Sequence, residues 1–84
     1  MRTKHARTLD RVFATPVPPS LRWDEVDAML VAKGARLASG RGSRVRVELH
    51  GVRAVFHRPH PRNELDRGAV VSLRRFLEQA GVTP

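Results

Sequence analysis

The segment that decides the fold runs from residue 44 to residue 57 and reads RVRVELHGVRAVFH. Its first six residues alternate between charged and apolar side chains, so Val45, Val47 and Leu49 share one face. This alternation has the period of a β-strand with one buried face. After the two-residue turn His50-Gly51 the chain returns with the same period, which predicts an antiparallel hairpin.

Three segments around this hairpin have helical periodicity. Apolar residues recur every three to four positions in residues 3–14, 23–33 and 68–80, which predicts three amphipathic helices. Prolines end the first helix and form a stiff connector, whereas Gly34 and Gly81 end the other two. The connector prolines are Pro16, Pro18 and Pro19.

A weaker strand candidate, residues 35–39, precedes the hairpin and is joined to it by a glycine-containing turn at residues 40–43. The predicted order is helix, helix, three strands and helix. Because each amphipathic element must bury its apolar side, we expect an α+β fold with helices on one face of a three-stranded antiparallel sheet. The chain has room for a single domain over residues 1–84, with residues 1–19 as N-terminal helix and connector and residues 20–84 as the core.

The composition favours a negatively charged partner. Sixteen Lys and Arg residues against eight Asp and Glu residues give a net charge of +8, which suits nucleic acid, an acidic protein or anionic lipid. The chain has no cysteine, so a disulfide framework and a thiolate metal site are excluded. No apolar run approaches the roughly 20 residues that span a bilayer, and no secretory signal is visible. We therefore expect a cytoplasmic protein without a membrane partner.

Positive charge is concentrated in the hairpin and in the loop after it. Glu48 is the only acid between residues 41 and 62. The alternation places Arg44, Arg46 and Arg53 on the sheet face turned away from the helices, with His57 beside them, and we expect the loop arginines to rim this face. Such a surface suits a phosphate backbone. The alternative is a face that charge merely keeps solvated, for which mixed signs are expected.

Four motifs occur in a characteristic order. They are Gly40-Arg41-Gly42-Ser43, the hairpin, His57-Arg58-Pro59-His60-Pro61 and Asn63-Glu64-Leu65-Asp66-Arg67-Gly68. Together they resemble the HicA (YcfA-like) toxin family of type II toxin-antitoxin systems, over about residues 21–83. The resemblance implies a fold similar to a double-stranded-RNA-binding domain. It also implies an mRNA endoribonuclease that inhibits translation and is neutralised by a HicB-like antitoxin.

The chain departs from the family at the catalytic histidine. The family's Gly-Ser-His motif corresponds here to Gly42-Ser43-Arg44. RNA cleavage needs a base for the 2′-OH proton and an acid for the leaving 5′-oxygen, and histidine suits both roles near pH 7. Arginine stays charged, so it stabilises the phosphorane but does not act as the base. The candidate catalytic residues are His57, His60 and Arg44, and the candidate RNA-binding residues are Arg41, Ser43, Arg46, Arg53, Arg58 and Arg62.

Three functions remain open at this point. The first is an RNA-binding toxin that cleaves mRNA without metal or cofactor. The second is a catalytically inactive RNA-binding or antitoxin-binding module of the same fold. The third is a DNA-binding regulator, against which the lack of a helix-turn-helix pattern counts.

The turn residue His50 and the first helix, residues 3–14, are not among these candidate site residues. His50 is expected to be an exposed turn residue without a specific role. The first helix either enlarges a small core or offers a partner an extra surface. In the second case Leu9, Val12 and Phe13 would be less buried in the free chain than in the complex.

Overall fold

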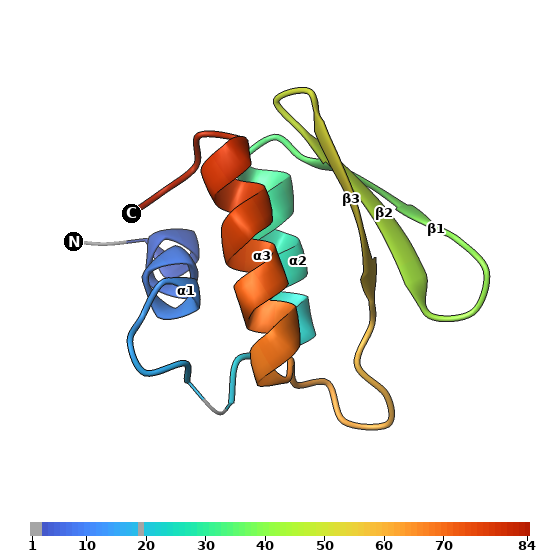
Figure 1. Cartoon of the computed structure of the whole chain (residues 1–84), viewed down its shortest axis with the longest axis horizontal. Coiled ribbons are helices and arrows are strands. Elements are labelled where there is room, and N and C mark those ends of the chain that lie inside the picture. The colour runs from blue at the N-terminus through green and yellow to red at the C-terminus, as the bar shows by residue number, and fades with distance from the viewer. Residues whose placement is uncertain (1–2, 19) are drawn as a thin grey trace.

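Three helices and three strands follow one another in the predicted order (Figure 1). This computed structural model describes residues 3–18 and 20–84, so Pro19 of the predicted connector lies outside the described residues. The α+β prediction is confirmed. The elements are α1 (Lys4–Val12), α2 (Trp23–Ala32), β1 (Arg36–Ser39), β2 (Arg44–Leu49), β3 (Val52–His57) and α3 (Arg67–Gln79).

The sheet is antiparallel, with β2 between β1 and β3. The alternating apolar residues of β2 face the helices, because Val45, Val47 and Leu49 are only 1–2% exposed. At the β2–β3 turn both His50 and Gly51 have positive φ, 50° and 82°, as the tightest hairpin turns require.

His50 does more than fill this turn, contrary to the sequence-based expectation. Its Nδ1 lies 2.8 Å from the carbonyl oxygen of Ala80, the residue that caps the C-terminus of α3. The last carbonyls of a helix lack partners within the helix, so His50 supplies one from the far end of the hairpin.

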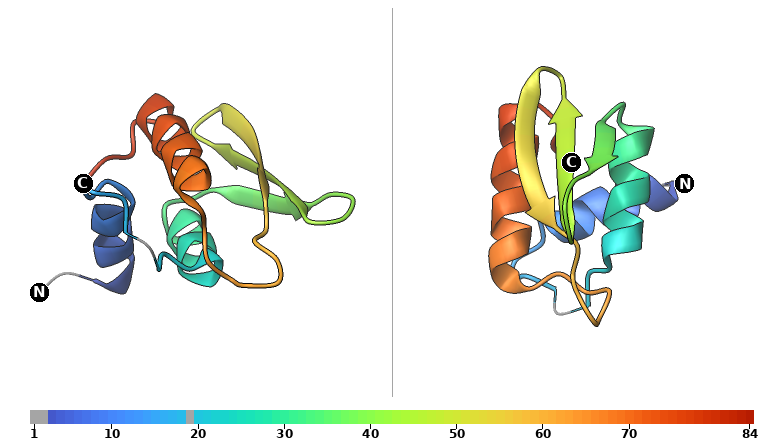
Figure 2. Two further views of the ribbon diagram at one scale, coloured as in Figure 1. Left: turned by 60° about the horizontal axis from the view of Figure 1, so that its bottom comes forward. Right: turned by 90° about the vertical axis from the view of Figure 1, so that its right-hand side faces the viewer.

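The helices form two layers on one side of the sheet (Figure 2). The layer next to the sheet consists of α2, which packs against β1, and α3, which packs against β3. The second layer is α1, which packs against both of these helices on their side away from the sheet. The prediction that the helices cover one sheet face is therefore confirmed. This arrangement leaves the other face of the sheet uncovered by any described residue of the three helices.

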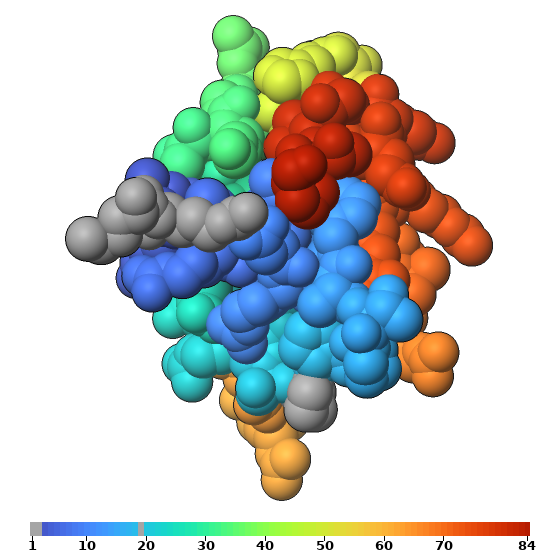
Figure 3. Space-filling view, turned by 90° about the vertical axis from the view of Figure 1, so that its left-hand side faces the viewer, coloured from blue at the N-terminus to red at the C-terminus, as the bar shows by residue number. Residues whose placement is uncertain are grey.

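Helix α1 is an integral part of the core. Leu9 and Val12 are 4% and 0% exposed. Together with the segment after it, α1 covers much of the side of the molecule that lies away from the sheet (Figure 3). Arg74 of α3 donates hydrogen bonds to the carbonyls of Val12 and Ala14 at the end of α1. Of the two roles considered for this helix, the structure therefore favours enlargement of the core.

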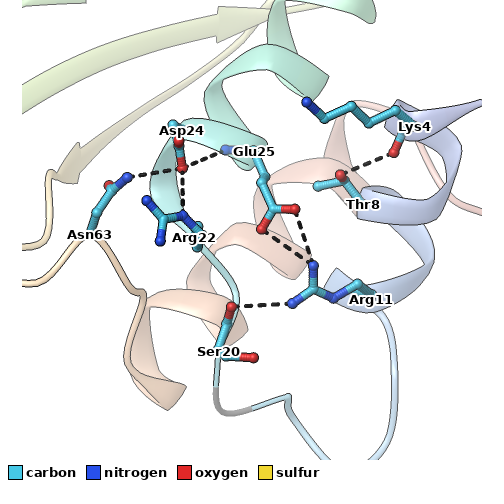
Figure 4. A network of polar contacts seen from close by, with 8 residues as sticks. All are labelled: Lys4, Thr8, Arg11, Ser20, Arg22, Asp24, Glu25 and Asn63. Carbon is cyan, nitrogen blue, oxygen red and sulfur yellow. Dashed lines mark hydrogen bonds and ion pairs between the residues drawn. The ribbon is translucent and has the colours of Figure 1, made fainter.

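A second arginine ties α1 to α2 (Figure 4). Arg11 Nη1 lies 3.3 Å from both carboxylate oxygens of Glu25, and its Nη2 donates to the carbonyl of Ser20 at 3.2 Å. This fork of donors links α1 to the beginning of α2 and to the chain before it.

Candidate functional site

The uncovered side of the sheet, here called the outer face, is strongly basic. The strand register and the side-chain alternation place Arg44, Arg46 and His57 on it, together with Arg53. The predicted grouping of these four residues is therefore observed. The complete set of strand side chains on the outer face is Arg36, Ala38, Arg44, Arg46, Glu48, Arg53, Val55 and His57.

Arg36 belongs to this face but was missed by the sequence analysis. It pairs with Glu48 across β1 and β2, so it extends the positive surface to the sheet edge. The alternation of Arg36, Leu37 and Ala38 was the available signal. Its orientation was not assigned, because a four-residue strand offers too few periods to identify its buried face.

Arg44 and His57 face each other across β2 and β3. The amide of Arg58 donates to the carbonyl of Ser43 at 2.8 Å, so the ladder hydrogen bonds flank this pair instead of joining it. Opposed side chains come closest at such positions. The Ser43 hydroxyl lies 3.5 Å from Nδ1 of His57, a contact that leaves Nε2 of the ring as the atom to meet a substrate.

A hollow of about 280 Å³ lies farther along the outer face and is here called the sheet groove. Predicted residues Arg46 and Arg53 line it. Glu48 is also in its wall, with Oε2 3.6 Å from Nε of Arg53. The full lining of the sheet groove is Arg36, Leu37, Ala38, Arg46, Val47, Glu48, Arg53 and Ala54.

A second hollow of about 370 Å³, here called the loop hollow, lies between the end of β3 and the beginning of α3. His57 and His60 both line it, together with Arg58 and Arg62. Its charge is mixed, however. The full lining is His57, Arg58, Pro59, His60, Pro61, Arg62, Glu64, Leu65, Asp66 and Ala69.

Two of the predicted arginines are not among the strand residues of the outer face. The guanidinium of Arg58 donates to the Ser39 hydroxyl at 2.5 Å, and Ser39 pairs with the buried Val45, so Arg58 reaches toward the helix side of the sheet. Arg58 also lines the loop hollow together with His57. Arg41 lies in the exposed β1–β2 turn and lines neither hollow.

The segment before α3 is anchored to the beginning of α2 (Figure 4). Asp24 accepts hydrogen bonds from the Asn63 side chain at 2.9 Å and from Arg22 at 3.3 Å. Desolvation acts to raise the pKa of Asp24, but the hydrogen bond and charge of Arg22, together with backbone hydrogen bonds of Asp24 and Glu25, hold this pKa below its ordinary value. The backbone of Leu65 is likewise bonded to Leu21. These contacts fix the end of the loop that carries His60.

Neither a metal-binding cluster nor a membrane-spanning helix occurs in residues 3–18 and 20–84. No group of three or more His, Asp or Glu side chains there is arranged to hold a metal ion. In the same residues no helix has the length and apolar character needed to cross a membrane.

A family model described as "HicA toxin of bacterial toxin-antitoxin" matches residues 23–82, the span from the first residue of α2 to just beyond α3. Comparisons with curated proteins and with solved structures found no match. The matched span contains the whole sheet, the Arg44–His57 pair and both hollows. The chain therefore belongs to the HicA toxin family of bacterial toxin-antitoxin systems.

Proposed function

We propose that this toxin binds RNA on the outer face of its sheet and cleaves it at the Arg44–His57 pair. The observation that carries the proposal is the placement of a histidine directly opposite the arginine that replaces the family's histidine. A base is thereby restored to this end of the sheet from the neighbouring strand. Arg36, Arg46 and Arg53 on the same face provide charge for the adjoining phosphates.

The chemistry assigns one role to each residue. Nε2 of His57 removes the proton from a ribose 2′-hydroxyl, and the resulting oxygen attacks the adjacent phosphorus. Arg44 stabilises the extra negative charge of the phosphorane. His60, on the wall of the loop hollow that His57 also lines, gives a proton to the leaving 5′-oxygen. The products are a 2′,3′-cyclic phosphate and a 5′-hydroxyl, and no metal or cofactor takes part.

We further propose that the partner is a HicB-like antitoxin that covers the outer face with acidic groups, and that both act in the cytoplasm. The support is the charge of this face. Among the strand residues, all of which the structure describes, Glu48 is the only acid. A partner with complementary charge would block RNA and bind rapidly.

The test is incubation of a long single-stranded RNA with the purified protein in EDTA, followed by a gel and a binding assay. The wild type is expected to cut the RNA. His57→Ala should lose at least about 100-fold in cleavage rate, the usual minimum for a general base, and still bind RNA. Arg44→Ala should lose both cleavage and some affinity. His50→Ala, at the other end of the hairpin, is the matched histidine control and should keep both.

Two outcomes would contradict the proposal. If the wild type binds RNA without cutting it, and Arg44→His cuts, the natural chain is a catalytically inactive RNA-binding module. If the wild type does not bind RNA at moderate salt, the RNA-directed function itself is wrong.

A further inference from the structure

We infer that the sheet groove is a nucleobase subsite and that Glu48 makes it selective for guanine. The inference rests on the proposed function, because it concerns which RNA the outer face accepts. Glu48 places a carboxylate between Arg36 and Arg53, on a face whose arginines otherwise attract phosphate.

The pairing of Glu48 with Arg53 does not account for its presence. Nε of Arg53 approaches Oε2 of Glu48 only to 3.6 Å, and the arginine side chain is 81% exposed. An exposed pair of this kind contributes little to stability. Glu48 itself is 38% exposed, so it is held partly within the groove and still reachable from solvent.

The make-up of the sheet groove suits a base better than a phosphate. A phosphate offers only acceptors and is repelled by a carboxylate, whereas a base offers donors, acceptors and a flat apolar face. The groove has a matching mixture: cations at Arg36 and Arg46, an acceptor at Glu48, and a small side chain at Ala38 that leaves its floor open. The side chains of Leu37 and Val47 belong to the core side, so their backbone forms part of that floor.

Guanine is the base whose donors fit a carboxylate best. Bases of single-stranded RNA are read along their Watson–Crick edges. On that edge guanine places N1–H and an N2 amino group side by side, so two parallel hydrogen bonds reach the two carboxylate oxygens, as in other bidentate pairs. Adenine and cytosine offer one amino donor next to an acceptor, and uracil offers one donor between two carbonyls.

The subsite lies within reach of the cleavage site proposed above. Glu48, Arg46 and Arg44 are alternate residues of β2 on one face. At about 3.3 Å per residue, Glu48 is about 13 Å along the strand from Arg44. One extended RNA strand therefore passes over both, with Arg46 between them.

The experiment compares binding of three RNA heptamers by fluorescence anisotropy at one salt concentration. All three have 2′-O-methyl riboses, which block cleavage. Six of the seven nucleotides are uridine in each, and the central nucleotide is uridine, guanosine or inosine. Inosine keeps N1–H but lacks the 2-amino group. The proteins are the wild type, Glu48→Gln and Glu78→Gln. Glu78 is an exposed acid on α3, so this control makes the same change in net charge away from the sheet.

We expect the wild type to bind the guanosine heptamer about tenfold more tightly than the uridine heptamer, within the range for a bidentate base contact. Inosine should fall between them. Glu48→Gln should bind the uridine heptamer more tightly than the wild type does, because a charge that repels phosphate is gone. Its affinity for the guanosine heptamer should exceed that for the uridine heptamer by less than about twofold. Glu78→Gln should keep the wild-type preference.

The other outcomes overturn the inference in distinguishable ways. If Glu48→Gln keeps the wild-type preference for guanosine over uridine, Glu48 does not recognise the base and only reduces the positive charge of the outer face. Binding of all three heptamers with equal affinity would remove the guanine subsite and leave the proposed RNA binding intact. Binding of none would overturn the proposed function together with this inference.

Discussion

At the scale of single residues, His50 shows how one side chain joins distant parts of this fold. It occupies a left-handed conformation, φ 50°, which residues other than glycine adopt uncommonly. Its ring reaches the carbonyl of Ala80, thirty positions away in the sequence. The hydrogen bond requires the proton on Nδ1, because a carbonyl oxygen only accepts.

We predict that His50→Ala lowers the free energy of unfolding by about 1 kcal/mol through loss of this hydrogen bond. Urea denaturation followed by circular dichroism measures it. His50→Asn is the matched control: asparagine tolerates the left-handed turn better than alanine, so it should lose less stability. Unfolding midpoints of both variants equal to that of the wild type would show that the contact with Ala80 contributes nothing.

At the scale of elements, α1 lies outside the family match, which begins at residue 23. It nevertheless supplies two buried apolar residues, Leu9 and Val12, and the buried Thr8. Arg74 and the Arg11–Glu25 pair fasten it from two sides. The helix thus covers the side of α2 and α3 that faces away from the sheet.

We predict that Leu9→Ala destabilises the protein by about 2 to 4 kcal/mol, the usual cost of truncating a buried leucine. Arg7→Ala, at an exposed position of the same helix, should change stability by less than about 0.5 kcal/mol. Chemical denaturation of both variants gives the comparison. Equal stability of the two would mean that α1 is not packed on the helices in solution.

At the scale of the whole molecule, the helices and the basic sheet face lie on opposite sides of the sheet. The helices stack on one side, and the outer face of the sheet presents arginines from all three strands. The chain's net charge of +8 adds a general attraction for polyanions to this local arrangement.

Salt dependence tests whether the outer face binds the RNA backbone. If about five phosphates of single-stranded RNA are contacted, the slope of log K against log salt should be about −3.5. Arg46→Ala should make the slope less steep by about 0.7, whereas Arg75→Ala, exposed on α3, should leave it nearly unchanged. Equal slopes for Arg46→Ala and the wild type would remove Arg46 from the interface.

The local sequence pattern predicted the bounds of the hairpin strands correctly but not those of helix α3. The hairpin strands were predicted residue by residue, because alternation with period two is written entirely in neighbouring positions. Helix α3 was predicted one residue late, as 68–80 instead of Arg67–Gln79. Its beginning is set by Asp66, whose carboxylate accepts from the amide of Ala69 at 2.7 Å, and apolar periodicity does not record such a cap.

By itself the sequence determined the α+β class, the order of the elements and the grouping of Arg44, Arg46, Arg53 and His57 on one sheet face. Each follows from residues close together in the chain, whose spacing alone decides which side is buried. Only the tertiary structure decided that Arg58 turns toward Ser39, that His50 meets Ala80 and that a groove forms around Glu48. These features depend on partners from separate elements, and local periodicity holds no information about how those elements come together.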